Sequence, residues 1–397
     1  MQKPNNDRSK KSAPGLNERL TIVAMAQVTD VIEQIAARVR AAAAAGSPLR
    51  IRGGGSKDFY GEQLAGEVLS TAPLAGVLAY EPSELVVTAG AGTPLRELDA
   101  LLAANGQCLP FEPPYFGSST ATVGGMVASG LSGPARASVG AVRDYVLGVK
   151  LINGRGEQLT FGGQVMKNVA GYDVSRLMAG AMGTLGLLTD VSLKVLPVAP
   201  GEATLRFECT QAQALDWLHA WGAQPLPLNA SCWVQESDKP GSGVLYLRLR
   251  GAVAAVESAC KALGGERKNN AEVAADWQAC RDQQLPWFQA RDASQDLWRL
   301  SLPQTTPVLD LPDIPLIEWH GGQRWVRAAA GEGQALRALA ASVGGHATLF
   351  IAASQIKSGA VARFDTLKPP LDRIHRQLKQ EFDPAGVFNP RRLSVDW

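Results

Sequence analysis

The segment PLRIRGGGSKDFYG, residues 48–61, places three consecutive glycines directly after a short run that is typical of a strand. Glycine has no Cβ, so its backbone can adopt positive φ and can lie close to a ligand. Successive peptide N–H groups in such a turn form a concave binding site for an anion. Arg50, Arg52 and Lys57 add positive charge beside it. The segment therefore predicts a phosphate-binding loop, with a plain glycine-rich turn as the alternative.

This loop differs from the two commonest nucleotide-binding motifs. It is neither G-x-G-x-x-G nor G-x-x-x-x-G-K-[ST], and the residues after Gly55 are not typical of a helix start. An ordinary dinucleotide-binding fold or a P-loop is therefore not expected.

Two further glycine-rich segments follow. PPYFGSSTATVGGMVASGLSGPARASVG, residues 113–140, combines six glycines with few charges. NVAGYDVSRLMAGAMGTLGLLTDV, residues 168–191, places glycines on both sides of an expected short helix. Long irregular segments inside a compact domain are usually functional. Three such segments in one region indicate a long ligand that is contacted along its length.

The remaining pattern predicts an α+β protein of two domains. Val28, Val31, Ile35 and Val39 have helical spacing, with Thr29 or Asp30 as the expected cap. Asn153-Gly154 between two apolar runs predicts a hairpin. After Pro200 glycine clusters become rarer and tryptophans more common. We therefore expect a disordered tail over 1–19, a first domain over 20–198 and a second over 199–397.

Composition excludes several classes of function. The net charge of +2 gives no basic field for nucleic acid. The five cysteines contain no C-x-x-C, and the four histidines show no metal-ligand spacing, so neither a metal site nor an iron–sulfur cluster is expected within this chain. No apolar run has the length of a membrane span, and the first residues lack the apolar core of a signal peptide. We expect a cytoplasmic protein.

Four segments together resemble a known family. They are RGGGS (52–56), ATVGGMVASGLSGPAR with RDYVLGVKLINGRG (121–156), KNVAGYDVSRLMAGAMGTLGLLT (167–189) and FDPAGVFNPRRL (382–393). They resemble the p-cresol methylhydroxylase/vanillyl-alcohol oxidase (PCMH-type) flavoproteins and, within these, the FAD-binding subunits of bacterial glycolate oxidases. The resemblance implies a PCMH-type FAD-binding domain, then a smaller α+β, ferredoxin-like cap domain whose C-terminal segment returns to the first domain.

The resemblance also implies roles for individual residues. Lys167 would favour the anionic reduced flavin, with a solvated lysine as the alternative. Arg299, on the polar face of the expected strand LWRLSLP, would pair with a substrate carboxylate, with a solvent-facing arginine as the alternative. The residues expected to contact FAD are Arg52, Gly53, Gly54, Gly55, Ser56, Thr122, Gly124, Gly125, Ser129, Gly183, Gly186 and Leu187.

The attachment of FAD and the partners follow from departures from the family pattern. Many relatives link FAD to a histidine near the glycine loop, but Ser56 stands here and all four histidines lie in the second half. We therefore expect non-covalent FAD. The H-x-G-D-G-N-x-H motif of hydroxyacid-oxidising relatives is replaced by GGHATLFIA (344–352).

The resemblance thus implies one subunit of a glycolate oxidase complex. A catalytic FAD-linked oxidase subunit and an iron–sulfur subunit would be its partners, glycolate its 2-hydroxy acid substrate, and any membrane association peripheral. The alternatives are a self-sufficient FAD-dependent oxidoreductase of another 2-hydroxy acid or alcohol, and a non-catalytic assembly subunit.

Overall fold

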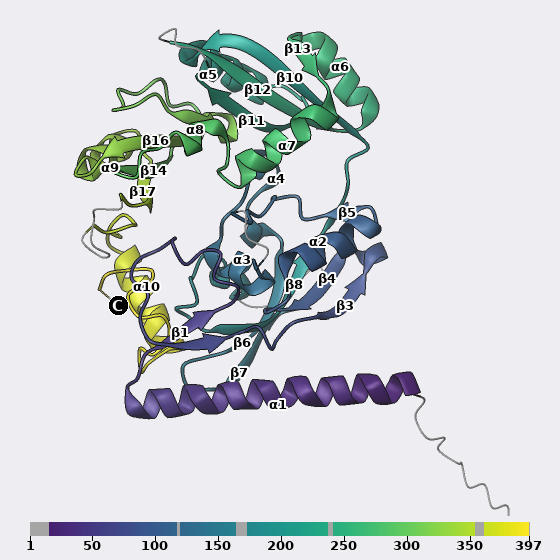
Figure 1. Ribbon diagram of the computed structural model, residues 1–397, viewed down its shortest axis with the longest axis vertical. Coiled ribbons are helices and arrows are strands. Elements are labelled where there is room, and N and C mark those ends of the chain that lie inside the picture. Colours follow the sequence, from purple (N-terminus) through teal and green to yellow (C-terminus); the bar gives the residue numbers. More distant parts are fainter. Residues whose placement is uncertain (1–15, 117–119, 164–172, 237–240, 354–360, 397) are drawn as a thin grey trace, which may run out of the picture.

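A computed structural model of the chain describes residues 16–116, 120–163, 173–236, 241–353 and 361–396 (Figure 1). The described residues form an α+β protein with two main sheets, as the sequence predicts. Lys167 and residues 1–15 of the expected tail lie outside the described residues.

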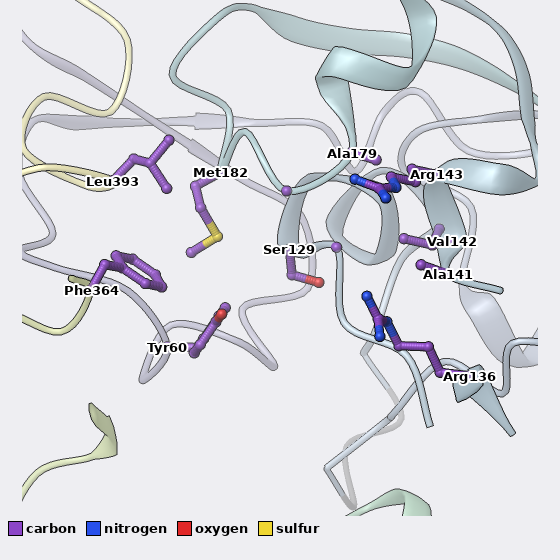
Figure 2. Close-up of a pocket in the computed structure, with 12 residues that line it drawn as sticks. Tyr60, Ser129, Arg136, Ala141, Val142, Arg143, Ala179, Met182, Phe364 and Leu393 are labelled. Atoms are coloured by element: carbon purple, nitrogen blue, oxygen red, sulfur yellow. The ribbon is translucent and has the colours of Figure 1, made fainter. Parts of the chain in front are cut away.

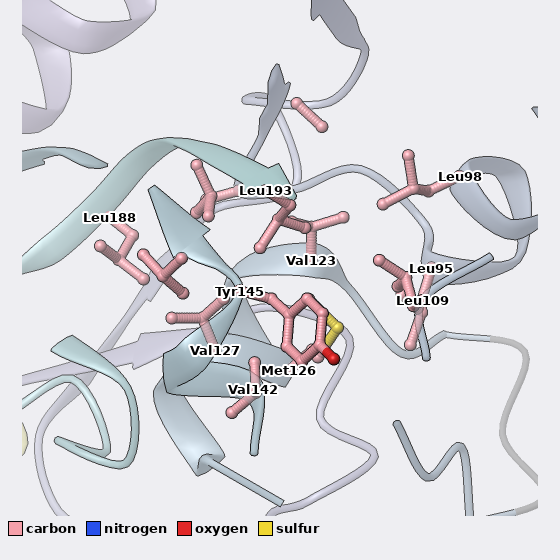
Figure 3. Close-up of a cluster of buried hydrophobic side chains, with 14 of the residues drawn as sticks. Leu95, Leu98, Leu109, Val123, Met126, Val127, Val142, Tyr145, Leu188 and Leu193 are labelled. Atoms are coloured by element: carbon pink, nitrogen blue, oxygen red, sulfur yellow. The ribbon is translucent and has the colours of Figure 1, made fainter. Parts of the chain in front are cut away.

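The first sheet is antiparallel, with the strand order β3-β4-β8-β6-β7. The predicted hairpin at Asn153-Gly154 is confirmed as the connection between β6 and β7. Apolar side chains from the sheet, α2 and α3 form one buried cluster (Figure 3). The elements of this region are β3 (Val77–Glu81), η1 (Pro82–Glu84), β4 (Val86–Gly90), α2 (Leu95–Ala104), β5 (Gln107–Cys108), α3 (Val123–Ser129), α4 (Arg136–Val139), η2 (Val142–Asp144), β6 (Val146–Ile152), β7 (Gln158–Gly162), η3 (Ser175–Met178), β8 (Leu187–Lys194) and β9 (Leu196–Pro197).

The glycine loop follows a separate small sheet, in which β1 (Leu49–Arg52) pairs in parallel with β2 (Glu67–Ser70). Helix α1 (Leu16–Ala45) precedes it and begins well before the expected cap at Thr29 or Asp30. Residues 16–19, expected in the tail, are therefore helical. The reason is the absence of glycine and proline between Gly15 and Gly46, so nothing in the sequence interrupts the helix.

The second sheet is antiparallel and has eight strands in the order β13-β10-β12-β11-β15-β16-β14-β17. Strands β13-β10-β12-β11 have the chain order 4-1-3-2 of a ferredoxin-like βαββαβ unit, and β15-β16-β14-β17 repeat this arrangement. The halves join where β11 pairs with β15 at Cys232 and Trp233. Because the unit occurs twice, this sheet has more strands than the first one. The expected α+β, ferredoxin-like cap is therefore a double unit.

The elements of the cap follow in chain order. They are β10 (Gly201–Thr210), α5 (Gln211–Gly222), β11 (Leu228–Val234), β12 (Ser242–Gly251), α6 (Val253–Leu263), β13 (Glu266–Lys268), α7 (Asn270–Arg281), α8 (Pro286–Gln289), β14 (Gln295–Ser301), β15 (Leu316–Glu318), η4 (Trp319–Gly321), β16 (Gln323–Ala329), α9 (Gly333–Ser342) and β17 (His346–Ile351). The last strand of the first sheet ends at Lys194 and β10 begins at Gly201. We retain the division near residue 198 as a proposal on this basis.

The C-terminal segment lies against the first domain. After α10 (Leu371–Phe382), Phe388 forms a parallel bridge with Leu49 of β1. The buried ammonium of Lys379 donates to the Asp383 carboxylate at 2.6 Å and to the carbonyl of Thr184 at 2.8 Å. The segment thus fixes β1, and with it the start of the glycine loop. Within the described residues, no helix has the length and apolarity to cross a membrane.

Candidate functional site

The glycine loop packs directly on the segment that leads into α3. A Cβ on Gly54 would lie 1.4 Å from the carbonyl oxygen of Thr120, whose hydroxyl donates to the Gly54 carbonyl at 2.7 Å. A Cβ on Gly53 would lie 2.3 Å from the hydroxyl of Thr122. Gly55 has φ +75°, which disfavours other residues. The glycines are therefore required for close approach of two backbone segments.

Thr122 and Gly183 shape the rest of this cradle. The Thr122 hydroxyl caps α3 by accepting a hydrogen bond from the Gly125 N–H at 3.2 Å. Gly183 has φ +72°, and a Cβ there would lie 2.7 Å from the amide nitrogen of Asn389. Asn389 also accepts from the Ile51 N–H at 2.7 Å. The C-terminal segment thereby joins the strand before the glycine loop to the glycine turn at 183.

The charges beside the loop are largely engaged within it. The guanidinium of Arg52 donates to the Asp58 carboxylate at 2.9 Å, and Arg50 pairs with the same carboxylate. Arg52, expected to contact FAD, therefore has an ion-pair partner of its own. The Lys57 ammonium lies 3.2 Å from the Ser56 hydroxyl, and burial lowers its pKa to about 8 despite the nearby Asp282.

Half of the twelve residues predicted to contact FAD line two neighbouring cavities. Five glycines line the first, which has a volume of about 70 Å³: Gly53, Gly124, Gly125, Gly183 and Gly186. Ser129 lines the second cavity. The Leu187 side chain is fully buried among Ile35, Leu49 and Phe388, because alternation along β8 directs Leu188 toward the first cavity instead.

Three cavities follow one another from the glycine loop to the interface between the two domains. The first shares Met182 with a second cavity of about 210 Å³. Figure 2 shows the guanidiniums of Arg136 and Arg143 on one side of this second cavity, and apolar side chains with Tyr60 on the other. A third cavity of about 450 Å³ shares Gly130 and both arginines with the second and extends to the cap. The arrangement suits an elongated ligand.

Arg299 lies at the far end of this route. In β14, Trp298 and Leu300 are buried against α9, whereas Arg299 lines the interdomain cavity together with His346. The Arg299 guanidinium donates to the Tyr60 hydroxyl at 3.3 Å, and its buried Nε has no partner. The predicted alternation along this strand is observed, and the pairing of Arg299 with a substrate carboxylate stays a prediction. Partial burial, Arg299 and Arg136 lower the pKa of His346.

Sequence reasoning missed three side chains of this region. Arg136 lies at the junction of two cavities, Asn389 holds the glycine turn, and the Arg392 guanidinium donates to the carbonyls of Lys57, Asp58, Tyr60 and Glu62. Asn389 and Arg392 lie in FNPRRL (388–393), part of the C-terminal segment that resembles the family, for which the sequence predicted no role. Arg136 carried no signal in the sequence. Among the described residues, no three His, Cys, Asp or Glu side chains are placed to hold a metal ion.

Comparison with known proteins identifies the family. Residues 24–162 match the family described as "FAD binding domain". The chain is 44% identical over 373 residues to the glycolate oxidase subunit GlcE of Escherichia coli K12, covering 94% of this chain and all of that protein. The chain belongs to the GlcE family of glycolate oxidase subunits.

More distant similarities cover parts of the chain or the fold alone. The D-lactate dehydrogenase of Archaeoglobus fulgidus is 34% identical over 42% of this chain and 37% of its own length. The glycolate oxidase subunit GlcD of Bacillus subtilis is 31% identical over 32% of this chain and 27% of its own length. The solved structure of an alkyldihydroxyacetonephosphate synthase, 14% identical, covers 90% of this chain and 74% of its own with a TM-score of 0.60.

The observed site fits FAD, the cofactor of this family. The matched residues contain the glycine loop and α3, which bound the first cavity on two sides. Because no side chain projects from Gly53, Gly124 or Gly125, backbone groups reach the cavity wall directly. Gly53–Ser56 and Thr122–Ser129 would hold the cofactor here, and the successive cavities would accommodate its length.

Proposed function

We propose that this chain binds FAD non-covalently and acts in a glycolate oxidase complex that converts glycolate to glyoxylate. The observation that carries the proposal is the similarity to GlcE over its full length, cap included. The names GlcE and GlcD denote different subunits of glycolate oxidase, which supports a multi-subunit assembly for this chain as well.

The oxidation removes two electrons and two protons from the carbinol of glycolate. Bound FAD supplies the two-electron acceptor. The chain's own residues bind and orient: the glycine loops hold the cofactor, and Arg299 pairs with the substrate carboxylate by a charge-assisted contact. Tyr60, Phe364 and Leu393 form an apolar wall of the second cavity, which keeps water away from the reacting groups (Figure 2).

The electrons then leave to a partner. We propose an iron–sulfur subunit as the acceptor and a catalytic FAD-linked oxidase subunit as a further partner, because this chain has no C-x-x-C motif of its own. We place the complex in the cytoplasm, with any membrane contact made through the partners.

Dye reduction tests this proposal. The purified FAD-loaded chain and the co-expressed complex are each mixed with glycolate and an artificial electron acceptor. We expect the complex to reduce the dye and the isolated chain not to, since the chain lacks the H-x-G-D-G-N-x-H motif of hydroxyacid-oxidising relatives. Equal rates per flavin in the two samples would contradict the proposal and favour a self-sufficient oxidoreductase.

Acid precipitation tests the mode of attachment. We expect all FAD in the supernatant after the protein is precipitated, because Ser56 occupies the place of the linking histidine in the glycine loop. Flavin absorbance that stays with the washed pellet would show a covalent bond. His346 would then be the candidate for the linking residue, because it lines the interdomain cavity.

A further inference from the structure

Arg136 occupies an unusual position between the two domains. It begins α4 in the FAD-binding domain, and its guanidinium carbon lies 4.5 Å from the centre of the Trp319 ring of the cap. It lines both the second and the third cavity (Figure 2). A single side chain thus links the cofactor end of the route to the cap end.

Arg143 pairs with Asp144, but the other two arginines that line the third cavity have no carboxylate partner among the described residues. Within the described part of the chain, Arg136 and Arg299 form no ion pair within 4.0 Å, whereas the buried Arg248 pairs with Glu112 at 2.6 Å. Asp144 is the one acidic residue among the described lining of the third cavity, and its nearest contact to Arg143 is 3.9 Å. The interdomain space therefore holds an excess of positive charge.

Such an arrangement is costly without an anion. Desolvation lowers the pKa of Arg136, and the neighbouring Arg299 and Arg143 lower it further, while Asp144 acts in the opposite direction. A bound carboxylate reverses this cost by supplying negative charge in a poorly solvated site. Arginine suits this role because its planar guanidinium matches both oxygens of a carboxylate.

Trp319 is held firmly under Arg136. Its indole N–H donates to the Gly133 carbonyl of the FAD-binding domain at 3.0 Å. The next residue, His320, donates its N–H to the Ser231 hydroxyl at 2.9 Å and contacts the Ser138 hydroxyl at 2.9 Å. Trp319 and His320 both have positive φ, 53° and 54°, a costly conformation that persists only where surrounding contacts fix it.

We propose that Arg136 and Arg299 together bind the carboxylate of the substrate, so that the anion site is complete only when the cap rests on the FAD-binding domain. Trp319 is the positioning residue for Arg136. This inference rests on the proposed function for the identity of its ligand, a small 2-hydroxy carboxylate, and adds the second arginine and its support.

Isothermal titration calorimetry with oxalate tests the site, because oxalate is a small carboxylate without an oxidisable C–H bond. The FAD-loaded protein is compared with five variants: Arg136→Gln, Arg136→Lys, Arg299→Gln, Trp319→Leu and Trp319→Phe. We expect the two Gln variants to bind oxalate at least about tenfold more weakly, since charge-assisted hydrogen bonds are lost. Arg136→Lys retains part of the affinity, and Trp319→Phe loses less than Trp319→Leu.

Arg96→Gln is the matched control. Arg96 also lies over an aromatic ring, 5.7 Å from the centre of Tyr115, but it lines none of the three cavities. Its replacement is expected to leave oxalate affinity unchanged. Thermal unfolding of every variant identifies any that fail to fold. If Arg136→Gln does not fold, the oxalate affinity of the more conservative Arg136→Lys tests the site.

Several outcomes would overturn the inference. Unchanged oxalate affinity in Arg136→Gln would do so, as would absence of oxalate binding to the unaltered FAD-loaded protein. If Arg136→Gln has a lower flavin midpoint potential than the unaltered protein but the same oxalate affinity, Arg136 stabilises the reduced flavin and does not bind the substrate carboxylate. If the complex fails to oxidise glycolate while oxalate binding depends on Arg136, the anion site stands and the proposed function falls. If the complex oxidises glycolate while oxalate binding does not depend on Arg136, the proposed function stands and the anion site falls.

Discussion

The glycine cradle and the domain interface are built in different ways. In the cradle there is no room for a side chain: a Cβ on Gly54 would meet the Thr120 carbonyl oxygen, and a Cβ on Gly53 would meet the Thr122 hydroxyl. At the interface, long side chains meet across the boundary. Glu112 of the FAD-binding domain, for example, accepts hydrogen bonds from Arg248 and Arg250 of the cap. The cradle depends on an absence of side chains, and this part of the interface, around Glu112, depends on charges that neutralise one another.

This difference predicts different responses to substitution. A methyl group added in the cradle meets a main-chain atom that cannot move aside. A charge removed at the interface leaves its partner buried without compensation. The first change should abolish ligand binding, whereas the second should reduce stability.

Gly54→Ala is expected to have the largest effect. Its Cβ would lie 1.4 Å from the Thr120 carbonyl oxygen. The glycine loop and the segment that leads into α3 must therefore move apart, and the proposed cofactor site lies between them. We expect the purified variant to contain almost no FAD, and added FAD not to raise its melting temperature as it does for the unaltered protein.

Gly222→Ala is the control for this prediction. Gly222 ends α5 in the cap, and a Cβ there would meet no atom within 4 Å. Its FAD content should equal that of the unaltered protein. Full FAD occupancy in Gly54→Ala would show that the close packing of the two segments is unimportant for binding.

Glu112→Gln tests the interface. Arg248 has a side chain only 2% exposed, and Glu112 is its carboxylate partner at 2.6 Å. Replacing one partner of a buried pair typically costs about 3–5 kcal/mol, because the other charge stays buried. We expect a loss of this size in the free energy of unfolding measured with denaturant.

A surface pair in the cap provides the comparison. Glu257 accepts two hydrogen bonds from Arg267, with both side chains 45% exposed. Glu257→Gln should leave the free energy of unfolding almost unchanged, since exposed pairs contribute little. Similar losses in both variants would remove the distinction between the interface and an ordinary surface pair.

The same contrast explains what the sequence could predict. The glycine loops were recognisable because a missing side chain is visible in the sequence itself. Gly53 and Gly183 line one cavity, and Thr122 packs against Gly53. Strand alternation correctly oriented Arg299. Within β8, however, it could not decide whether Leu187 or Leu188 faces the cavity, because that choice depends on register against β6.

Contacts between distant residues were beyond sequence reasoning. Arg136 and Trp319 are 183 positions apart and meet only because the cap folds back on α4. The repeat within the cap was hidden because its second half replaces the first helix by the proline-containing segment 302–315, which has no helix in the structure. The start of α1 was missed because apolar periodicity, rather than the lack of helix breakers, was used to place it.

His320 gives the interface a dependence on pH. Burial lowers the pKa of this ring from 6.5 to about 4, so the folded protein keeps it neutral while the unfolded chain binds a proton below 6.5. The unfolded state then holds more protons between about pH 6.5 and about pH 4, and stability falls as pH falls through this window. Between about pH 7.5 and about pH 5 the loss due to His320 should be about 2 kcal/mol.

His320→Asn should abolish this part of the acid sensitivity, and asparagine tolerates the positive φ at this position. His219→Asn, at an exposed position on α5, should leave it unchanged. Denaturant unfolding at the two pH values provides the measurement. An identical pH dependence in His320→Asn and the unaltered protein would mean that the interface does not hold a neutral histidine.

A crystal structure of the FAD-loaded protein would show whether the glycine loop and the interdomain cavity hold one cofactor. We expect the diphosphate against Gly53–Ser56 and α3, and the isoalloxazine toward the interdomain cavity lined by Arg136 and Arg299, with no bond to a side chain. A flavin ring placed away from this cavity, or a diphosphate that does not touch the glycine loop, would contradict this expectation.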